Sequence, residues 1–305
     1  MAQQPYVPAG SWYQPASLPP ANWYPDPSGV AELRYWDGRS WTSTVSVGGH
    51  VDERPMPPPP PHPYVAAPAP PEPRPEPQPR LPGRAAVIAL IGFVAGLAAS
   101  IVLSLLGAVL GLPDIVRLVA SQAGLWGGLL GACRVVSRRF GTGHVARDFG
   151  LVMAWSDVGW GLLMSLAGRI AVAIAVLPFL PFPRLVGGND EVFRVFNTDT
   201  VSFVVVALLA IAGAPIVEEL FFRGVLQGAF LDRLGTVWAV GLSSVLFGLA
   251  HFNPILGLAN VSLITAITAA GIVFGITVRL RRLGSSVFAH SFFNMVAVGV
   301  AAAAR

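Results

Sequence analysis

Residues 85–111 read AAVIALIGFVAGLAASIVLSLLGAVLG, a run of 27 residues without a charged side chain. An α-helix rises about 1.5 Å per residue, so roughly 20 apolar residues cross the ~30 Å of hydrocarbon in a bilayer. The run is long enough to span a membrane as a helix. It predicts that this part of the chain folds in lipid.

Similar runs continue to the end of the chain. We place seven spans near residues 85–111, 115–136, 157–181, 200–217, 236–252, 258–279 and 285–304. The composition agrees, because 53% of residues are hydrophobic and 12% are charged, against about 25% charged in a soluble domain. The predicted fold is an all-α polytopic membrane protein with about seven transmembrane helices.

The charge of the loops predicts the orientation, since Lys and Arg concentrate on the cytoplasmic side. With seven spans, ten arginines fall on one side: Arg80, Arg84, Arg134, Arg138, Arg139, Arg147, Arg233, Arg279, Arg281 and Arg282. We therefore expect a cytoplasmic N-terminus. Because these arginines are dispersed at helix ends and do not cluster on one face, no nucleic-acid partner is predicted.

Two polar regions precede the first span. Residues 20–46 are short and rich in tryptophan, and turn signals on either side of Leu33–Trp36 predict a small β-hairpin whose core is Trp23, Trp36 and Trp41. Residues 47–84 are dominated by proline and predict an extended, polyproline-II-like cytoplasmic linker. The remaining residues are predicted to form a disordered tail (1–19) and the membrane domain (85–305).

The tryptophan-rich region contains W-Y-P-D-P at residues 23–27 and R-Y-W-D-G-R-S-W-T at residues 34–42. In these motifs it resembles the short actinobacterial domain catalogued as DUF2510, whose function is unknown. The resemblance implies a bacterial lineage, and with it a bacterial plasma membrane as the location, but no chemistry. A small folded knob and a module that binds a cytoplasmic partner both remain open.

Ionisable side chains within membrane spans are costly and mark function by default. The first group is APIVEELFFRG, at residues 214–224. Glu219 and Arg223 are four residues apart, so they share a helix face and can pair. Glu218 points about 100° away. One carboxylate is therefore predicted to be structural and the other free for proton chemistry, unless the group is a charged helix end at the membrane surface.

The other two groups contain histidines within apolar spans. His251 ends the motif F-x-x-x-H that begins at Phe247, and His290 and Asn294 are four residues apart in the last span, so they face the same way. Taken alone, His251 could be an interfacial or packing residue. The pair of His290 and Asn294 could be an interhelical hydrogen-bonding pair.

A count of residues along the chain predicts that the first two groups lie close together. The turn between their helices falls near Leu234, and Glu218 lies 16 residues before it while His251 lies 17 after it. Both therefore reach the same depth in an antiparallel hairpin, if the helix continues through Pro215. His290 is only about six residues beyond Gly284, so straight helices would leave it far from that level. We expect a tilted, broken or re-entrant segment within residues 253–284.

The ordered motifs E-E-x-x-x-R, F-x-x-x-H and H-x-x-x-N resemble the CAAX-processing and bacteriocin-immunity family of intramembrane endopeptidases. The resemblance covers roughly residues 85–305, with its specific part in 214–294. It implies that Glu218 activates water with help from His251, and that His290 and Asn294 bind the oxyanion or hold the site. By the same resemblance, Glu219 and Arg223 support the site.

The cofactor stays open at this point. Glu218, His251 and His290 make a plausible ligand set for a divalent metal, zinc first, and members of the family are often labelled metalloproteases. The chain has no H-E-x-x-H helix, which favours a metal-free reaction. We predict an intramembrane endopeptidase that is either glutamate-dependent or a metalloprotease.

Two other functional classes compete with the peptidase. One is a non-catalytic protein, either a bacteriocin self-immunity factor or a membrane scaffold. The other is a small transporter, which would be built from a repeat of broken spans that the sequence lacks. Four intact site residues favour the peptidase. Its expected substrate is a membrane-embedded or lipid-anchored peptide, because prenylated CAAX tails are not expected in a bacterium.

Arg169 is the remaining charge out of place, near the middle of the third span. Three interpretations are open. The side chain snorkels to the membrane surface, pairs with a site carboxylate, or binds the C-terminal carboxylate of a substrate.

Overall fold

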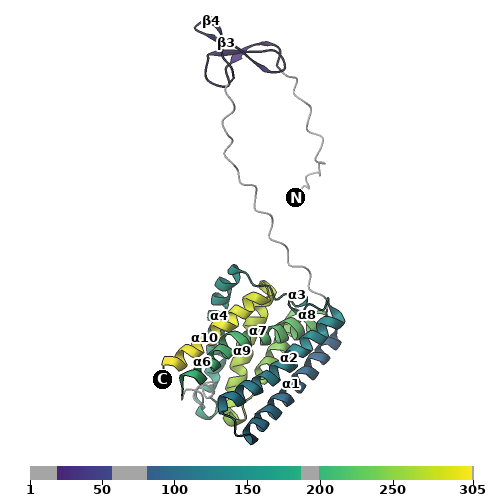
Figure 1. Ribbon diagram of the computed structural model, residues 1–305. Helices are drawn as coiled ribbons and strands as arrows, with labels where there is room; N and C mark the ends of the chain where they lie inside the picture. The colour runs from purple at the N-terminus through teal and green to yellow at the C-terminus, as the bar shows by residue number, and fades with distance from the viewer. Residues whose placement is uncertain (1–18, 57–80, 187–198, 304–305) are drawn as a thin grey trace, which may run out of the picture. The chain divides into compact units, whose positions relative to one another are not determined.

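The computed structural model describes residues 19–56, 81–186 and 199–303, and the chain divides into two compact units, Met1–Arg74 and Pro75–Arg305 (Figure 1). Residues 1–18 of the predicted tail and residues 57–80 of the predicted linker lie outside the described residues.

The N-terminal unit is an antiparallel sheet. Its four strands are β1 (Asn22–Pro25), β2 (Leu33–Trp36), β3 (Trp41–Val47) and β4 (His50–Glu53), paired in sequence order. The sequence predicted a hairpin and assigned β4 to the linker. The extra strand forms because Gly48 and Gly49 both have positive φ, as a two-residue hairpin turn requires. Val47 consequently pairs with His50.

The centre of this sheet is a buried ion pair. Arg34 is fully buried, and its Nε lies 2.9 Å from Asp26 Oδ1. The guanidinium also donates hydrogen bonds to the carbonyls of Thr42 and Arg54. The three tryptophans expected to supply the core are half-buried and meet Tyr24 and Tyr35 or one another edge to face. Their prediction as the main core is therefore wrong.

The second unit is helical, as expected. Its longer elements are α1 (Gly83–Val109), α2 (Asp114–Phe140), α4 (Trp155–Val176), α6 (Thr200–Leu208), α7 (Ala214–Glu219), α8 (Gly228–Leu249), α9 (Asn260–Leu280) and α10 (Leu283–Ala303). Short elements join them: α3 (Val145–Asp148), the 3₁₀ turns η1 (Leu177–Phe179), η2 (Pro183–Leu185) and η5 (Pro254–Ala259), and the π-helical segments η3 (Leu209–Gly213) and η4 (Leu220–Gln227).

Six helical stretches in the described part of the chain are long and apolar enough to cross a membrane. The fourth, Thr200–Leu249, has 50 residues and would be about 75 Å long as one helix. It is broken at Gly235, whose φ of 74° and ψ of 173° are accessible essentially to glycine alone. The stretch is therefore two helices. The prediction of an all-α membrane fold with about seven spans is confirmed, although the fourth helix continues well past its predicted end at residue 217.

Apolar side chains cover the outside of this unit and fill its centre. Large residues such as Ile91 in α1 and Ile174 in α4 are exposed, as lipid-facing positions should be. The interior is a cluster rich in phenylalanine around α7 and η4 that includes Phe221, Phe247 and Phe274. The unit is thus an integral, multi-pass membrane domain.

Small residues allow α1 and α2 to pack closely. Gly92 and Gly96 on α1 face Gly128 on α2. A Cβ at Gly96 would lie 2.6 Å from the Leu125 carbonyl oxygen. This is the close backbone approach that G-x-x-x-G spacing permits in membranes, and it holds α2 as one wall of the bundle (Figure 1).

Candidate active site

The two adjacent carboxylates lie on α7 and have different surroundings. Glu219 is fully buried, and its Oε1 lies 3.3 Å from Arg223 Nη1, so the predicted i,i+4 pair is present. Its other oxygen accepts a hydrogen bond of 2.6 Å from Ser286 Oγ. Glu218 instead lines an internal cavity. The short helix sits between two π-helical segments, η3 and η4, which are often found at functional sites.

The hairpin closed at Gly235 aligns the first two motifs in depth. Gln227 and Ser243 each lie eight residues from Gly235, and their side chains are 3.4 Å apart. Arg223 and Phe247 are each twelve residues away, and the Arg223 Cζ lies 4.2 Å from the ring centroid. Glu219 and His251 each lie sixteen residues from Gly235, so they are at the same depth, and Glu218 is next to Glu219. Glu218 and His251 line the same cavity, as the residue count predicted.

His290 reaches this level by a route that the sequence did not indicate. It is the eighth residue of α10, and its Nδ1 lies 3.1 Å from Glu219 Oε1. The expected irregularity within 253–284 is confined to η5, where Gly257 breaks the helix, and α9 runs unbroken to Leu280. The first turn of α10 is instead buried inside the protein.

An ion pair keeps that first turn inside. Asp157, in the first turn of α4, lies 3.0 Å from Arg282 Nε and accepts a hydrogen bond of 2.6 Å from Ser285 Oγ. Because α10 starts within the bundle and not at its surface, two turns of helix are enough to bring His290 to Glu219.

In both histidines of the site, Nδ1 is bonded within the protein and Nε2 is left available. His251 Nδ1 lies 2.8 Å from the Phe247 carbonyl oxygen, which can only accept a hydrogen bond. His290 Nδ1 similarly faces the Glu219 carboxylate. Nδ1 is therefore the protonated nitrogen in each ring, and Nε2 remains for chemistry. His290 Nε2 lies 3.9 Å from Glu218 Oε2, and its ring stacks on Phe274.

Asn294 joins α10 to the helix that carries the glutamates. Its Nδ2 donates a hydrogen bond of 2.8 Å to the carbonyl of Ala210. That carbonyl lacks a helical donor, because the Ala214 N–H bonds Leu209 and the next residue, Pro215, has no N–H. Asn294 therefore compensates for the proline. One N–H of its amide remains for another acceptor.

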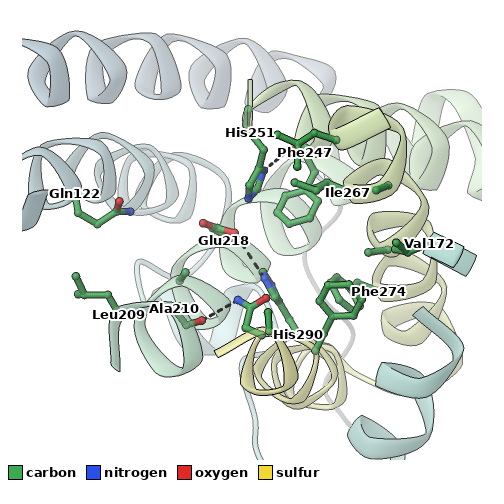
Figure 2. A pocket seen from close by; sticks show the side chains of 18 of the residues that line it. Gln122, Val172, Leu209, Ala210, Glu218, Phe247, His251, Ile267, Phe274 and His290 are labelled. Atoms are coloured by element: carbon green, nitrogen blue, oxygen red, sulfur yellow. Dashed lines mark hydrogen bonds and ion pairs between the residues drawn. The ribbon is translucent and has the colours of Figure 1, made fainter. Parts of the chain in front are cut away.

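The four predicted catalytic residues line one cavity of about 560 Å³. Figure 2 shows Glu218, His251 and His290 converging on it from three helical segments. Glu218 Oε2 is buried and has no hydrogen-bond partner among the described residues. Most of the remaining lining is apolar and comes from α2, α4, α6, α9 and α10. This is the composition of a ligand site, with a few convergent polar groups in an apolar wall.

Sequence reasoning missed three residues around the site. Ser286 bonds Glu219, while Gln122 and Trp126 of α2 line the cavity. Neither α2 residue carries a charge or belongs to a motif, so only their position reveals them. Arg169 does not line the cavity. Its guanidinium bonds the Phe293 carbonyl and lies over the Phe293 ring, which leaves no support for a substrate-carboxylate role.

The predicted metal ligands have one feature of a metal site and lack another. The hydrogen bonds that orient His251 and His290 are typical of metal-ligating histidines. However, residues 19–56, 81–186 and 199–303 contain no group of three His, Cys, Asp or Glu side chains close enough to hold a metal ion. As placed, Glu218, His251 and His290 do not form a complete metal site.

Comparison with known proteins agrees with the motifs. Residues 200–296 match the family model described as Type II CAAX prenyl endopeptidase Rce1-like, and residues 21–64 match that of Protein of unknown function (DUF2510). Both resemblances noted in the sequence are thereby confirmed. The first match contains all four predicted catalytic residues.

One curated protein is similar over part of the chain. It is named "Putative membrane peptidase YdiL", from Bacillus subtilis, and is 30% identical over 157 residues. The similarity covers 50% of this chain and 57% of the relative. No solved structure matches this chain significantly.

Proposed function

We propose that the helical unit is an intramembrane endopeptidase that hydrolyses a membrane-associated peptide with water activated by Glu218 and His251. The supporting observation is the buried Oε2 of Glu218, which has no hydrogen-bond partner among the described residues and borders the same cavity as three further polar side chains of the motifs. A buried acceptor without a donor is costly, and a water or substrate in the cavity would satisfy it.

In the first step, water attacks the scissile carbonyl carbon while Glu218 accepts one of its protons. His251 Nε2, a lone-pair acceptor because Nδ1–H donates to Phe247, binds the second water proton and directs the attacking oxygen. The new C–O bond places negative charge on the former carbonyl oxygen. Asn294 can donate its free N–H to this oxyanion, and His290 can donate from Nε2 when both ring nitrogens are protonated.

In the second step, Glu218 passes its proton to the amide nitrogen. The C–N bond then breaks, releasing a carboxylic acid and an amine, and the glutamate is again a carboxylate. Glu219 keeps its hydrogen bond to His290 Nδ1 throughout, so its role is to position that ring. Arg223 neutralises Glu219.

Zinc, or another divalent metal bound by Glu218, His251 and His290, remains an alternative prediction. Such an ion would act as a Lewis acid and generate hydroxide. Metal analysis of the purified protein decides between the two. Stoichiometric metal, with activity lost on chelation and restored by the ion, would contradict the metal-free mechanism.

The first test compares membrane-fraction peptides from cells that express the wild type or Glu218→Gln. We expect cleaved membrane peptides to depend on Glu218, with a rate loss of about 10²- to 10⁴-fold in the variant, as for a general base. Asp114→Asn is the matched control, because Asp114 is an exposed carboxylate on α2 paired with Arg117.

Identical peptide profiles, with both proteins expressed and inserted, would contradict the peptidase and favour a bacteriocin self-immunity or scaffold function. The apolar cavity wall supports a membrane-embedded or lipid-anchored peptide as the substrate class.

We also propose that the protein lies in a bacterial plasma membrane with its N-terminus in the cytoplasm. The concentration of loop arginines on one predicted side supports this orientation. Reporter fusions at the two ends should report opposite sides of the membrane. A cytoplasmic signal at the C-terminus would require an even number of spans.

For the N-terminal unit we propose a cytoplasmic protein partner that is rich in proline. Trp36 Nε1 and the Tyr24 hydroxyl donate hydrogen bonds of 3.0 and 2.9 Å to the carbonyls of Pro19 and Pro20. Aromatic donors bind polyproline-II ligands in this way. Affinity capture with the full chain and its Trp36→Phe variant tests the proposal, because an indole-dependent ligand should be lost from the variant.

A further inference from the structure

Two polar side chains of α2 face the active site without any assigned role. Gln122 and Trp126 both line the cavity that contains Glu218. They are four residues apart, so they share one face of the helix. Figure 2 shows Gln122 extending from α2 toward the side of the cavity that holds Glu218. The α2 side of the cavity therefore carries two polar groups in addition to those of the motifs.

Neither side chain is satisfied within the described part of the chain. The indole Nε1–H of Trp126 is buried and has no hydrogen-bond partner there, and no described residue bonds the Gln122 carboxamide. Buried polar groups in native proteins are nearly always paired, so the unpaired indole N–H costs about 1–3 kcal/mol. Gln122 is only partly buried. A ligand that enters the cavity would supply the missing partners.

The Trp126 ring packs against Gly213. A Cβ at Gly213 would collide with the six-membered ring of Trp126. Gly213 ends the π-helical segment η3 and immediately precedes α7, which carries Glu218. The indole is thus held against the base of the catalytic helix, so its N–H has a defined position relative to Glu218.

The spacing of the two side chains matches an extended peptide. Residues four apart on a helix are separated by about 6 Å along its axis. Alternate residues of an extended chain, whose peptide groups point the same way, are separated by about 6.6–6.8 Å. A peptide lying along α2 can therefore present one peptide group to Gln122 and the next equivalent carbonyl to Trp126.

We propose that α2 is the substrate-binding wall of this active site, on which Gln122 and Trp126 bond alternate peptide groups of an extended, apolar segment. This rests on the proposed peptidase function. The Gln122 carboxamide can both donate to and accept from one peptide unit, and the Trp126 indole donates to a carbonyl. Helical peptide groups are already bonded internally, so the substrate class is an unwound apolar segment and not an intact helix.

Binding of a probe peptide tests the wall without relying on turnover. The full chain is purified in detergent as Glu218→Gln, and the probe is a labelled hexapeptide of alternating leucine and alanine, followed by fluorescence anisotropy. We expect added Trp126→Phe or Gln122→Leu to weaken binding roughly 5- to 100-fold, the equivalent of one buried hydrogen bond. The matched control is Trp238→Phe, because Trp238 is exposed and does not line the cavity.

A second probe distinguishes contact with the peptide backbone from a change in packing. Methylating the nitrogens of alternate residues in the hexapeptide removes their N–H groups. The methylated peptide should bind the Glu218→Gln protein more weakly. Adding Gln122→Leu should then cost less than it does with the unmethylated peptide, because the bond from the peptide N–H to Gln122 is already absent. Additive losses would overturn the proposal, as would unchanged binding in Trp126→Phe or no binding by the Glu218→Gln protein.

The two proposals can fail separately. If peptide binding depends on Gln122 and Trp126 but cells show no Glu218-dependent cleavage, the substrate-binding wall is supported and the peptidase function is contradicted. If cleavage depends on Glu218 but all variants bind the peptide equally, the peptidase function is supported and the substrate-binding wall is contradicted.

Discussion

Glu218 and Glu219 are neighbours of identical chemistry whose surroundings give them different roles. Glu219 is held by Arg223, Ser286 and His290, so both of its carboxylate oxygens serve the fold and the orientation of one imidazole. Glu218 keeps a buried oxygen beside the cavity that forms no hydrogen bond with any described residue and has only His290 Nε2 at 3.9 Å. The helical twist of about 100° per residue separates the two carboxylates.

The Arg223–Glu219 pair is predicted to dominate stability at the site. Arg223→Leu leaves Glu219 buried without its counter-charge, so the free energy of unfolding should fall by roughly 3–5 kcal/mol. The measurement is denaturant unfolding of the purified protein in detergent. Arg117→Gln, which breaks an exposed pair with Asp114, should change the same quantity by less than about 1 kcal/mol. Similar losses in the two variants would contradict this assignment.

Asn294 is predicted to stabilise the helix that contains Pro215. Asn294→Leu removes the donor to the Ala210 carbonyl and should lower the free energy of unfolding by about 1–3 kcal/mol. Pro215→Ala restores a main-chain N–H near that carbonyl, so Asn294→Leu should cost less in that background. If the two changes are simply additive, Asn294 does not compensate for the proline.

At the scale of the elements, two connections determine how the motifs meet. The break at Gly235 folds one long apolar stretch into a hairpin and brings Glu218 and His251 to one level. The buried start of α10, held by Asp157, brings His290 and Asn294 to the same cavity. Without either connection the three motifs would lie on separate helices at different depths.

The hairpin at Gly235 is predicted to depend on glycine for its backbone conformation alone. No atom lies within 4 Å of a Cβ built there, whereas φ is +74°. Gly235→Ala should therefore lower the free energy of unfolding by about 1–3 kcal/mol. Gly241→Ala, in the helix that follows the break and with equally open space, should be neutral or stabilise the protein by up to ~1 kcal/mol. Thermal unfolding of the two variants checks this, and equal shifts would contradict it.

At the scale of the whole molecule, the chain combines two units with different solvents. The helical unit has a phenylalanine-rich interior and an apolar outer surface. The N-terminal sheet is small and is organised around the buried pair of Arg34 and Asp26. Conditions that break this pair should therefore unfold one unit without the other.

Acid is such a condition. The hydrogen bond from Arg34 holds the pKa of Asp26 well below its usual range. Because the folded pKa lies below the unfolded value of about 3.9, Asp26 stabilises the sheet above that pH, and this contribution is lost as the pH falls toward the folded pKa. Indole NMR signals of Trp23, Trp36 and Trp41 should collapse below about pH 4, while the helical circular dichroism persists.

The Asp26→Asn variant provides the control for that titration. It should have a less stable sheet at pH 7, and the stability of its sheet should change less between pH 7 and pH 3. A variant that follows the wild-type pH dependence would show that other groups cause the acid unfolding.

Local spacing in the sequence was sufficient for much of this protein. Hydrophobic runs predicted the spans, the four-residue spacing predicted the pair of Glu219 and Arg223, and counting from Leu234 predicted that Glu218 and His251 share a level. These features depend only on helix geometry and on one short turn. Both involve residues that are close together in the sequence. The Gly48–Gly49 turn was also readable, although the predicted hairpin did not use it.

Tertiary packing alone decided the rest. His290 reaches Glu219 because α10 begins inside the bundle, and that burial depends on Asp157, more than a hundred residues earlier. Gln122 and Trp126 face Glu218 from a helix about a hundred residues away. Residue spacing determines which side chains share a helix face, but which faces meet depends on how distant helices pack, and no local pattern encodes that.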